Sequence, residues 1–561
     1  MIDRRCALAR SRATRSGLAV ALIAGGVAGS QAARGDDFNN RISPGNLLVS
    51  RSVYDNDPNN VVAGVTLLPP NCVGSACAAA NAGGTYPEVF NNDLVDGSFG
   101  ITSKIVLDQL TTSGSLINSI EVPNSSQHGI ERNSDQMVTS FSSKSELALN
   151  LSTDHSTLTF MGYLAPVDAL DASNSNTPGV VDPTNPVNQS VYRVVGELDQ
   201  HGHFRFTKTN AYSGNNGRAA IMNGYGVSPV VYTAGNAGNG SNPQPNGVII
   251  GAGAQILAFA NTPLVAQSPG DPTPVGSFNV TQLGLPSDKI GKDTNFRGLT
   301  IFNNVIYMTK GSGSNGINTV YFIDTSGFNA NQQPLACPNG VGVPSATATL
   351  PTSPIFYDAN LLQTEGVFPY NMCILNGFPT GLAKKDTSTF PFGLWFADAH
   401  TLYVADEGNG TNTYDPSTNS YTAAAAQTMA GLQKWVFNGS TWSLAYVLQT
   451  GLQLGTPYTV AGYPTGNNPA TGLPWSPATD GLRNLTGRVN GDGTVTIWAI
   501  TSTVSGGGDQ GADPNKLVRI TDKLSASGLP AGESFNTVES AGFAEVLRGV
   551  SFTPGTPTLT N

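Results

Sequence analysis

The sequence predicts an all-β protein built as a single β-propeller, and three observations support that prediction. Glycine (65) and proline (36) are abundant among the 561 residues, and only 12% of the residues are charged. Glycine and proline are unfavourable inside helices but frequent in the turns between short strands. A strand–turn–strand–loop–strand order recurs along the chain, and each end of the chain matches part of one such unit. The 39% share of hydrophobic residues is enough to form a core.

The clearest unit begins at Arg297. Two apolar runs, residues 297–302 and 305–309, flank the turn Asn303-Asn304, which is a hairpin signal. A Gly-rich stretch, 311–316, then leads to a third apolar run, 318–324. This order is typical of a propeller blade.

The same order recurs at units that begin near Glu146, Arg218, Phe392 and Arg483. In the Phe392 unit, Asn438-Gly439 turns the chain into a fourth strand, 441–448. Four short strands per repeated unit describe propeller blades with insertions.

The two chain ends together predict one more blade. Residues 548–552 match the start of a blade, whereas residues 45–50, 105–108 and 115–120 match its outer strands. A blade made from both ends closes the ring and removes exposed sheet edges. We therefore expect six four-stranded blades, or seven if residues 325–390 contain another. Two stacked β-sandwich domains are the alternative.

Four segments carry a resemblance to known proteins: RGLTI (297–301), LYVAD (402–406), LQKWVFNGSTW (432–442) and RGVSF (548–552). Together with the blade order, they resemble a group of largely uncharacterised, exported bacterial β-propeller proteins. The resemblance covers most of residues 45–555. It implies the fold and export, and it implies no particular activity.

Residues 1–32 are expected to be a signal peptide, so that residues 33–561 form the propeller domain. Five arginines precede the short apolar run 18–29, and small residues follow at the cleavage position. Removing this segment leaves 23 basic and 37 acidic residues, a net charge of −14. That charge argues against nucleic acid and anionic lipid as partners. We expect a secreted or periplasmic monomer that is not inserted into a membrane.

Four cysteines remain after the predicted cleavage. An even number in an exported chain favours disulfides, here Cys72–Cys77 and Cys337–Cys373. A metal site is the weaker interpretation, because no histidine lies near either pair.

The longest predicted loops and insertions are expected to hold the function. In a propeller, the connection between the second and third strands opens on the face where the innermost strand begins, and here most of those connections are long. Binding residues usually lie in long loops on a rigid scaffold. The long loops and insertions of the domain are 54–104, 163–189, 325–391, 407–430 and 455–481. Of these, 163–189 and 407–430 join second to third strands, and 325–391 and 455–481 join blades on the same face.

Arginine recurs at the start of the predicted inner strand in four copies. The residues are Arg218, Arg297, Arg483 and Arg548. In an acidic chain these guanidinium groups, placed at the channel mouth, are suited to a carboxylate or phosphate ligand. The alternative is structural: each arginine bonds blade carbonyls or a nearby carboxylate such as Asp480 or Glu545.

Two further candidate sites lie in the loops. Tyr458, Tyr463 and Trp475 are expected either to form a stacking platform for sugar rings or to pack on one another within the loop.

Asp406, Glu407 and Asp415 supply oxygen atoms suited to calcium, the one cofactor that the sequence suggests. A solvated polar loop is the alternative.

Two functions remain open. The first is an exported binding or scaffold protein for an extracellular glycan, a small anionic ligand or a protein. The second is an extracellular hydrolase or lyase acting on a polysaccharide or ester, with carboxylates such as Glu131, Glu365 or Asp406 beside the arginines. The sequence holds no nucleophile elbow, phosphate-binding loop or dinucleotide motif.

Overall fold

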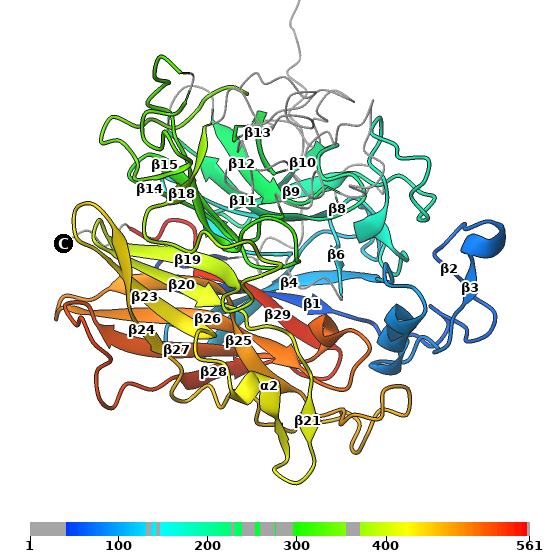
Figure 1. The fold of residues 1–561 in the computed structure, drawn as a ribbon. Helices are drawn as coiled ribbons and strands as arrows, with labels where there is room; N and C mark the ends of the chain where they lie inside the picture. The colour runs from blue at the N-terminus through cyan, green and yellow to red at the C-terminus, as the bar shows by residue number, and fades with distance from the viewer. Residues whose placement is uncertain are drawn as a thin grey trace, which may run out of the picture. The chain divides into compact units, whose positions relative to one another are not determined.

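The computed structural model describes residues 41–130, 136–141, 146–225, 229–237, 253–258, 275–276, 295–331, 333–354 and 371–557. Six of the sheets that these residues form are the six blades of a β-propeller (Figure 1), and two further two-stranded sheets lie in its loops. The sheets are antiparallel apart from one short parallel pair. The predicted all-β propeller is therefore confirmed. The propeller belongs to the unit that spans residues 32–561, and the predicted signal peptide lies outside the described residues.

The first blade contains both ends of the propeller. Strand β29 (Glu545–Phe552) pairs with β1 (Leu47–Val53), which pairs in turn with β4 (Thr102–Leu110). Strand β5 (Leu116–Glu121) completes the blade. In Figure 1 the red β29 lies beside the blue β1. The expected closure of the ring by the two chain ends is confirmed.

The other blades follow in chain order. Blade 2 contains β7 (Asn150–Leu151), β8 (Thr157–Tyr163), β9 (Arg193–Asp199) and β10 (Phe204–Thr209). The described part of blade 3 contains β11 (Gly217–Asn223), β12 (Val230–Gly235) and β13 (Ala254–Ala258). Blade 4 contains β14 (Leu299–Phe302), β15 (Val305–Lys310), β16 (Thr319–Ile323) and β18 (Met372–Leu375), with the short β17 (Val341–Gly342) beside β18.

Blades 5 and 6 each have four strands. Blade 5 contains β19 (Pro391–Asp398), β20 (Thr401–Asp406), β23 (Gly431–Phe437) and β24 (Trp442–Leu448). Blade 6 contains β25 (Ala478–Val489), β26 (Thr494–Val504), β27 (Lys516–Lys523) and β28 (Asn536–Ser540).

The six innermost strands form a closed ring. Contacts run from β29 to β7, β11, β14, β19 and β25, and then back to β29. Glycines permit this close approach: a Cβ atom on Gly393 would lie 2.5 Å from the backbone oxygen of Arg483 in the next blade. A closed ring of six leaves no place for a seventh blade and rules out two stacked sandwiches.

The core lies between neighbouring blades, and a repeated aromatic residue fills it. The second strand of each of blades 2 to 6 contributes one large buried ring, from Phe160, Tyr232, Tyr307, Tyr403 and Trp498. Each of these rings is at most 6% exposed. Aromatic side chains bury a large apolar area, so this one position accounts for much of the packing between blades.

The longest described insertion has its own small aromatic core. Residues 54–101, between β1 and β4, contain β2 (Leu67–Leu68), β3 (Ala78–Ala79) and the 3-10 helices η1 (Gly74–Ala76) and η2 (Glu88–Leu94). Tyr86 and Phe90 of this insertion pack in one cluster with Tyr463 and Trp475 from the β24–β25 connection. The insertion is thus held against loops of blade 6.

Both predicted disulfides are present. Cys72–Cys77 closes a small loop within the insertion, and Cys337–Cys373 ties the segment after β16 to β18. Cys337 and Cys373 are fully buried.

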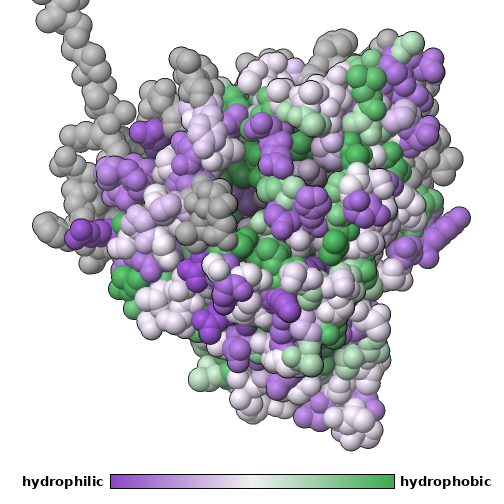
Figure 2. Space-filling model, turned by 90° about the vertical axis from the view of Figure 1, so that its left-hand side faces the viewer, coloured by the Kyte–Doolittle hydropathy of each residue, from purple (hydrophilic) through white to green (hydrophobic). Residues whose placement is uncertain are grey.

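The face shown in Figure 2 carries small hydrophobic groups scattered among polar residues. No helix among the described residues is long and apolar enough to cross a membrane.

Candidate functional site

The four arginines predicted from the repeat lie at equivalent positions on the inner ring. Arg218, Arg483 and Arg548 lie on β11, β25 and β29, and Arg297 lies two residues before β14. The backbone N–H of Arg297 donates to Thr309 O at 2.8 Å and so extends that hairpin. We call these four residues the arginine cluster. Blades 5 and 2 place Phe392 and Leu147 at the corresponding position, as the close glycine contacts between neighbouring blades show.

The arginine cluster lies at the end of the ring where the long loops open. Tyr86 of the insertion and Asp509 of the β26–β27 loop are close enough to Arg548 to affect its pKa. Glu407, directly after β20, lies between Arg297 and Arg483. The expectation that the arginines face the long loops therefore agrees with the structure.

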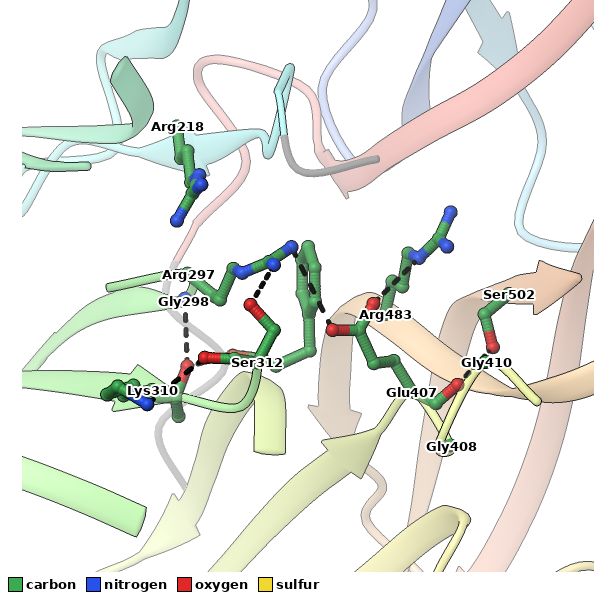
Figure 3. A network of polar contacts seen from close by, with 12 residues as sticks. Arg218, Arg297, Gly298, Lys310, Ser312, Glu407, Gly408, Gly410, Arg483 and Ser502 are labelled. Atoms are coloured by element: carbon green, nitrogen blue, oxygen red, sulfur yellow. Dashed lines mark hydrogen bonds and ion pairs between the residues drawn. The ribbon is translucent and has the colours of Figure 1, made fainter. Parts of the chain in front are cut away.

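One half of the arginine cluster is neutralised by a carboxylate. Glu407 accepts a hydrogen bond from Arg483 Nε at 3.2 Å, and its other oxygen lies 3.8 Å from Arg297 Nη1 (Figure 3). Arg297 also donates to Ser312 Oγ, and its guanidinium carbon lies 5.8 Å from the centre of the Phe392 ring. Glu407 is itself held by Ser502, whose hydroxyl donates to the Glu407 backbone oxygen at 2.6 Å.

The other half of the cluster, Arg218 and Arg548, has hydrogen bonds but no carboxylate partner among the described residues. Arg548 Nε donates to Ser52 Oγ at 3.1 Å, but Arg548 Nη1 and Nη2 are buried without a hydrogen-bond partner. Arg218 Nη1 donates to Phe296 O at 3.2 Å and Nη2 donates to Asn216 Oδ1 at 3.5 Å, while Arg218 Nε is buried and has no acceptor. Within the described residues, neither Arg218 nor Arg548 forms an ion pair.

Burial and mutual repulsion act on these arginines together. Burial, followed by the positive charge of Arg483, lowers the pKa of Arg548 to about 10. Burial and the charge of Arg297 lower the pKa of Arg218 well below its usual range. Arginine side chains stay protonated in proteins, and a buried charge is costly unless a counter-charge accompanies it.

Glu146 and Asp509 are the carboxylates whose charges reach Arg548, and both oxygens of Glu146 are already engaged. One oxygen accepts from Thr139 Oγ1 at 2.8 Å and from the Ser140 N–H at 3.1 Å. The other accepts from Asn216 Nδ2 at 2.8 Å and from the Tyr163 hydroxyl. The negative charge of Glu146 offsets part of the lowering of the pKa of Arg218 and of Arg548.

Arg193 shows what a structural arginine looks like in this molecule. It is fully buried on β9, and all three of its side-chain nitrogens donate hydrogen bonds. The acceptors are Ser175 Oγ and the backbone oxygens of Ser173, Ser175, Asn176, Val191 and Asn215. Nothing in the blade repeat singles out Arg193, because it lies on a third strand.

The carboxylates that the structural interpretation proposed for the arginines are engaged elsewhere. Glu545 pairs with Arg51. Asp480 accepts from the Gly410 N–H at 2.8 Å and from Gln427 Nε2 at 2.5 Å. Glu407, which the sequence analysis expected to bind calcium, instead forms ion pairs with Arg297 and Arg483 of the arginine cluster.

Asp406, Glu407 and Asp415, the residues expected to bind calcium, make separate contacts in the structure. Asp406 is buried and accepts from the N–H groups of Phe390 and Gly408. Asp415 lies half-buried in the hairpin of β21 (Tyr414–Asp415) and β22 (Ser420–Tyr421), where it accepts from Ser417. No group of three His, Cys, Asp or Glu side chains among the described residues is placed to hold a metal ion.

The stacking platform is also absent, because the rings face inward. Tyr463 is 7% and Trp475 is 3% exposed, and their rings pack edge to face in the aromatic core of the insertion. The Tyr458 hydroxyl donates to Pro514 O, and Lys516 Nζ lies 3.7 Å from the centre of the Tyr458 ring. The aromatic residues therefore pack the loop, as the alternative interpretation held.

The loop boundaries differ slightly from those predicted. The β24–β25 connection ends at residue 477, because β25 already begins at Ala478. The 407–430 loop contains the helix α2 (Thr422–Ala425), and the β8–β9 loop contains η3 (Ala172–Asn174). Glu131 and Glu365 lie outside the described residues.

Comparisons with known proteins add little. No family model and no curated protein matches this chain. Among solved structures, an ulvan lyase from a new polysaccharide lyase family, bound to -[GlcA(1-4)Rha3S]-, matches with a TM-score of 0.28 and 9% identity over 88% of this chain and 96% of that chain. The extracellular domains 1-2 of Drosophila Semaphorin 1a match with a TM-score of 0.18 and 9% identity over 76% and 72% of the two chains. At such scores neither likeness bears on function.

Proposed function

We propose that this protein is an exported binding propeller whose arginine cluster holds the anionic group of an extracellular ligand. The observation that carries the proposal is Arg548, which is 4% exposed and has both terminal nitrogens buried without an acceptor. A carboxylate, phosphate or sulfate supplies two oxygens in the geometry that one guanidinium edge recognises. Arg218 Nε, across Leu147 on the ring, supplies a further free donor.

The contrast with Arg193 supports a ligand rather than a structural role. The same fold satisfies the guanidinium of Arg193 entirely with backbone and hydroxyl oxygens. Buried polar groups in native proteins are almost always paired, and an exception calls for an explanation. An anion bound at Arg548 explains the exception and neutralises the repulsion along the arginine cluster.

Binding is favoured over catalysis by the state of the nearby carboxylates. Glu146 and Glu407 are each fixed by several donors, and Asp406 accepts from Thr389, Phe390 and Gly408. A general acid or base must be free to exchange a proton with substrate. The hydrolase or lyase alternative therefore stays a prediction, and the assay below includes it.

The charge distribution suggests a small anionic ligand or an acidic glycan rather than a polyanion. The chain is acidic overall, with a formal charge of −10, while four of its arginines lie together in one buried cluster. The surrounding negative charge repels extended polyanions such as nucleic acid, whereas a single acidic group can enter. The proposal also includes a secreted or periplasmic location, a monomeric state and membership of the exported propeller group that the sequence resembles. The two disulfides are consistent with export.

The experiment is a calorimetric titration of the purified protein with phosphate, sulfate, citrate and a tetragalacturonate, compared with the Arg548→Met variant. Hydrogen bonds to charged groups are worth about 1.5–3 kcal/mol, so the variant should bind the active anion about 10- to 100-fold more weakly. Arg488→Met, at the far end of β25, is the charge-matched control and should bind as wild type. Chromatography of the oligosaccharide after incubation detects turnover. Failure of every anion to bind, or equal binding by Arg548→Met, would refute the proposal.

A further inference from the structure

A pocket of about 230 Å³ opens at the outer half of blade 2. It lies where β8 begins and where β9 and β10 meet in their hairpin. Strand β7 runs from the end of the ring that holds the arginine cluster into the turn before β8. The pocket and the arginine cluster therefore lie at opposite ends of the blade strands, and the pocket is a separate site.

Strand pairing brings polar side chains together on one face of blade 2 here. Glu197 of β9 pairs with Thr159 of β8 and with Arg205 of β10, and Asp199 pairs with Thr157. Directly paired residues of antiparallel strands project from the same face, as do residues two apart on one strand. The side chains of these pairs therefore project to one side of the blade, and all except Thr159 line the pocket.

Glu197 is the buried residue of the pocket, and one of its oxygens is unpaired. Glu197 is 2% exposed, its Oε1 accepts from the Thr207 hydroxyl at 3.1 Å, and its Oε2 is buried without a hydrogen-bond partner. In the strand register, Thr207 lies on the side of Glu197 away from the hairpin turn, whereas Asp199 of the pocket lies on the turn side. The contact with Thr207 therefore leaves Oε2 for the pocket. A buried polar atom without a partner is rare in native proteins and calls for an explanation.

The hairpin turn forms the exposed rim of the pocket. Asp199 Oδ1 accepts from the N–H groups of His201 and His203 at 2.8 and 3.0 Å, and Asp199 Oδ2 lies 3.1 Å from His203 Nδ1. These contacts orient the His203 imidazole, whose side chain is 53% exposed. The two histidines do not form a metal site, because no group of three metal-binding side chains in the described part of the chain is placed to hold an ion.

We propose that this pocket binds one neutral sugar unit and that a sugar hydroxyl is the missing partner of Glu197 Oε2. The lining combines a guanidinium, which only donates, with carboxyl oxygens, an imidazole and hydroxyl groups, which accept. A sugar hydroxyl donates and accepts at once, so a set of hydroxyls matches such a mixed lining. An ammonium group only donates and a carboxylate only accepts, so each would face groups of its own kind.

The size and charge of the pocket agree with a single neutral unit. Pockets for drug-sized ligands measure about 300–1,000 Å³, and this one is smaller. Arg205 and Asp199 carry opposite charges that offset each other. Burial raises the pKa of Glu197 to about 8, against the smaller effects of Thr207 and Arg205, so this carboxyl is largely uncharged at neutral pH. The pocket therefore has little net charge to attract an ion.

The test is saturation-transfer NMR and calorimetric titration of the purified protein with glucose, galactose and mannose, and with glucosamine as a cationic probe. At least one neutral sugar should bind at one site per chain with a Kd on the order of 1 mM, the affinity of a ligand of about twelve non-hydrogen atoms. Arg548→Met should bind that sugar as wild type does, so the result is independent of the anion site. Saturable binding by none of the neutral sugars, or by glucosamine alone, would overturn the proposal.

Two variants locate the site. Glu197→Met keeps the length of the side chain but removes both oxygens, and it should weaken binding of the sugar about 10-fold or more. His203→Ala alters an exposed rim residue, so it should fold as wild type and should weaken binding about 2- to 10-fold through the loss of one hydrogen bond. If both variants bind the sugar as tightly as wild type, the sugar binds elsewhere and the assignment is wrong.

Glu539→Met is the matched control. Glu539 on β28 of blade 6 also has a buried Oε2 without a partner and a pKa that burial raises to about 7, but it does not line the pocket. This variant should bind the sugar as wild type does. A loss equal to that of Glu197→Met would show that removing any buried carboxyl impairs binding, and it would contradict the assignment to this pocket.

Discussion

Two buried arginines should respond in opposite ways to the same substitution. Arg548 and Arg193 are 4% and 0% exposed, and both belong to blades that flank the β29–β7 contact. Methionine retains most of the packing of the aliphatic stem and removes the charge. In the ligand-free protein, we expect Arg548→Met to leave stability unchanged or to raise it, and Arg193→Met to lower it.

The magnitude for Arg548 follows from its surroundings. Its pKa of about 10 lies below the ordinary value, which is above 12, and each pKa unit is worth about 1.4 kcal/mol. The charged form is therefore disfavoured by about 3 kcal/mol relative to water. Methionine removes this cost and loses the hydrogen bond to Ser52 Oγ, worth about 1–2 kcal/mol. The net change is a stabilisation of about 1–2 kcal/mol.

Arg193→Met is expected to lower the free energy of unfolding. Methionine would leave the backbone oxygens of Ser173, Asn176, Val191 and Asn215 without this donor in a buried site. A buried acceptor without a partner costs about 1–3 kcal/mol. Burial lowers the pKa of Arg193 to about 10 as well, so methionine relieves a similar cost there. The many lost hydrogen bonds outweigh that relief, and we expect a net loss of about 3–5 kcal/mol, the range found when one partner of a buried charged network is removed.

The assay is urea unfolding with thermal melting in anion-free buffer, in parallel for both variants. A domain of this size shifts its melting temperature by about 1 °C per kcal/mol, so the two variants should differ by about 4–7 °C. If Arg548→Met destabilises the protein as much as Arg193→Met, Arg548 is a structural residue. The anion proposal would then lose its foundation.

Two further predictions test the packing of the ring and a buried acid. Gly393→Ala places a Cβ atom 2.5 Å from Arg483 O and should lower the free energy of unfolding in urea by about 1–3 kcal/mol. Gly491→Ala is the control and should be close to neutral, because nothing lies within 4 Å of the new atom. Equal effects of the two substitutions would contradict the close approach of β19 and β25. Burial raises the pKa of Glu197 to about 8, above its value of about 4 in the unfolded chain. Between these two pH values the folded state holds a proton on Glu197 that the unfolded state has lost. The contribution of Glu197 to the free energy of unfolding therefore falls as the pH rises from about 4 to 8. Glu197→Gln should therefore melt close to wild type at pH 5 and above it at pH 8, and a melting difference that does not grow with pH would show that Glu197 is not buried as the structure has it.

The blade repeat was readable from the sequence because its signals are local. Hairpin turns such as Asn303-Asn304 and the apolar runs beside them are set by neighbouring residues, and the recurrence of one order supplied the architecture. The composite blade followed from the matching ends of the chain. The blade count needed the structure, because only contacts between inner strands show that six close the ring.

The sequence predicted where the arginines of the candidate site lie, but it did not predict which carboxylate pairs with them. The repeat placed Arg218, Arg297, Arg483 and Arg548 at one register position, and the structure brings them together there. The partner of Arg297 and Arg483 could not be read in the same way, because Glu407 reaches them from a loop whose course no periodicity records. The burial of Tyr463 and Trp475 depends on an insertion nearly 400 residues earlier in the chain.

The asymmetry of the arginine cluster follows from the two blades that break the repeat. Phe392 in blade 5 leaves a gap between Arg297 and Arg483, and Glu407 from the same blade fills it with a negative charge. Leu147 in blade 2 leaves the equivalent gap between Arg548 and Arg218, and there the carboxylate of Glu146 is bound by Tyr163 and Asn216. One gap is thus closed by the chain itself. The other presents free guanidinium nitrogens from both sides, and this arrangement suits an acidic group that arrives with a ligand.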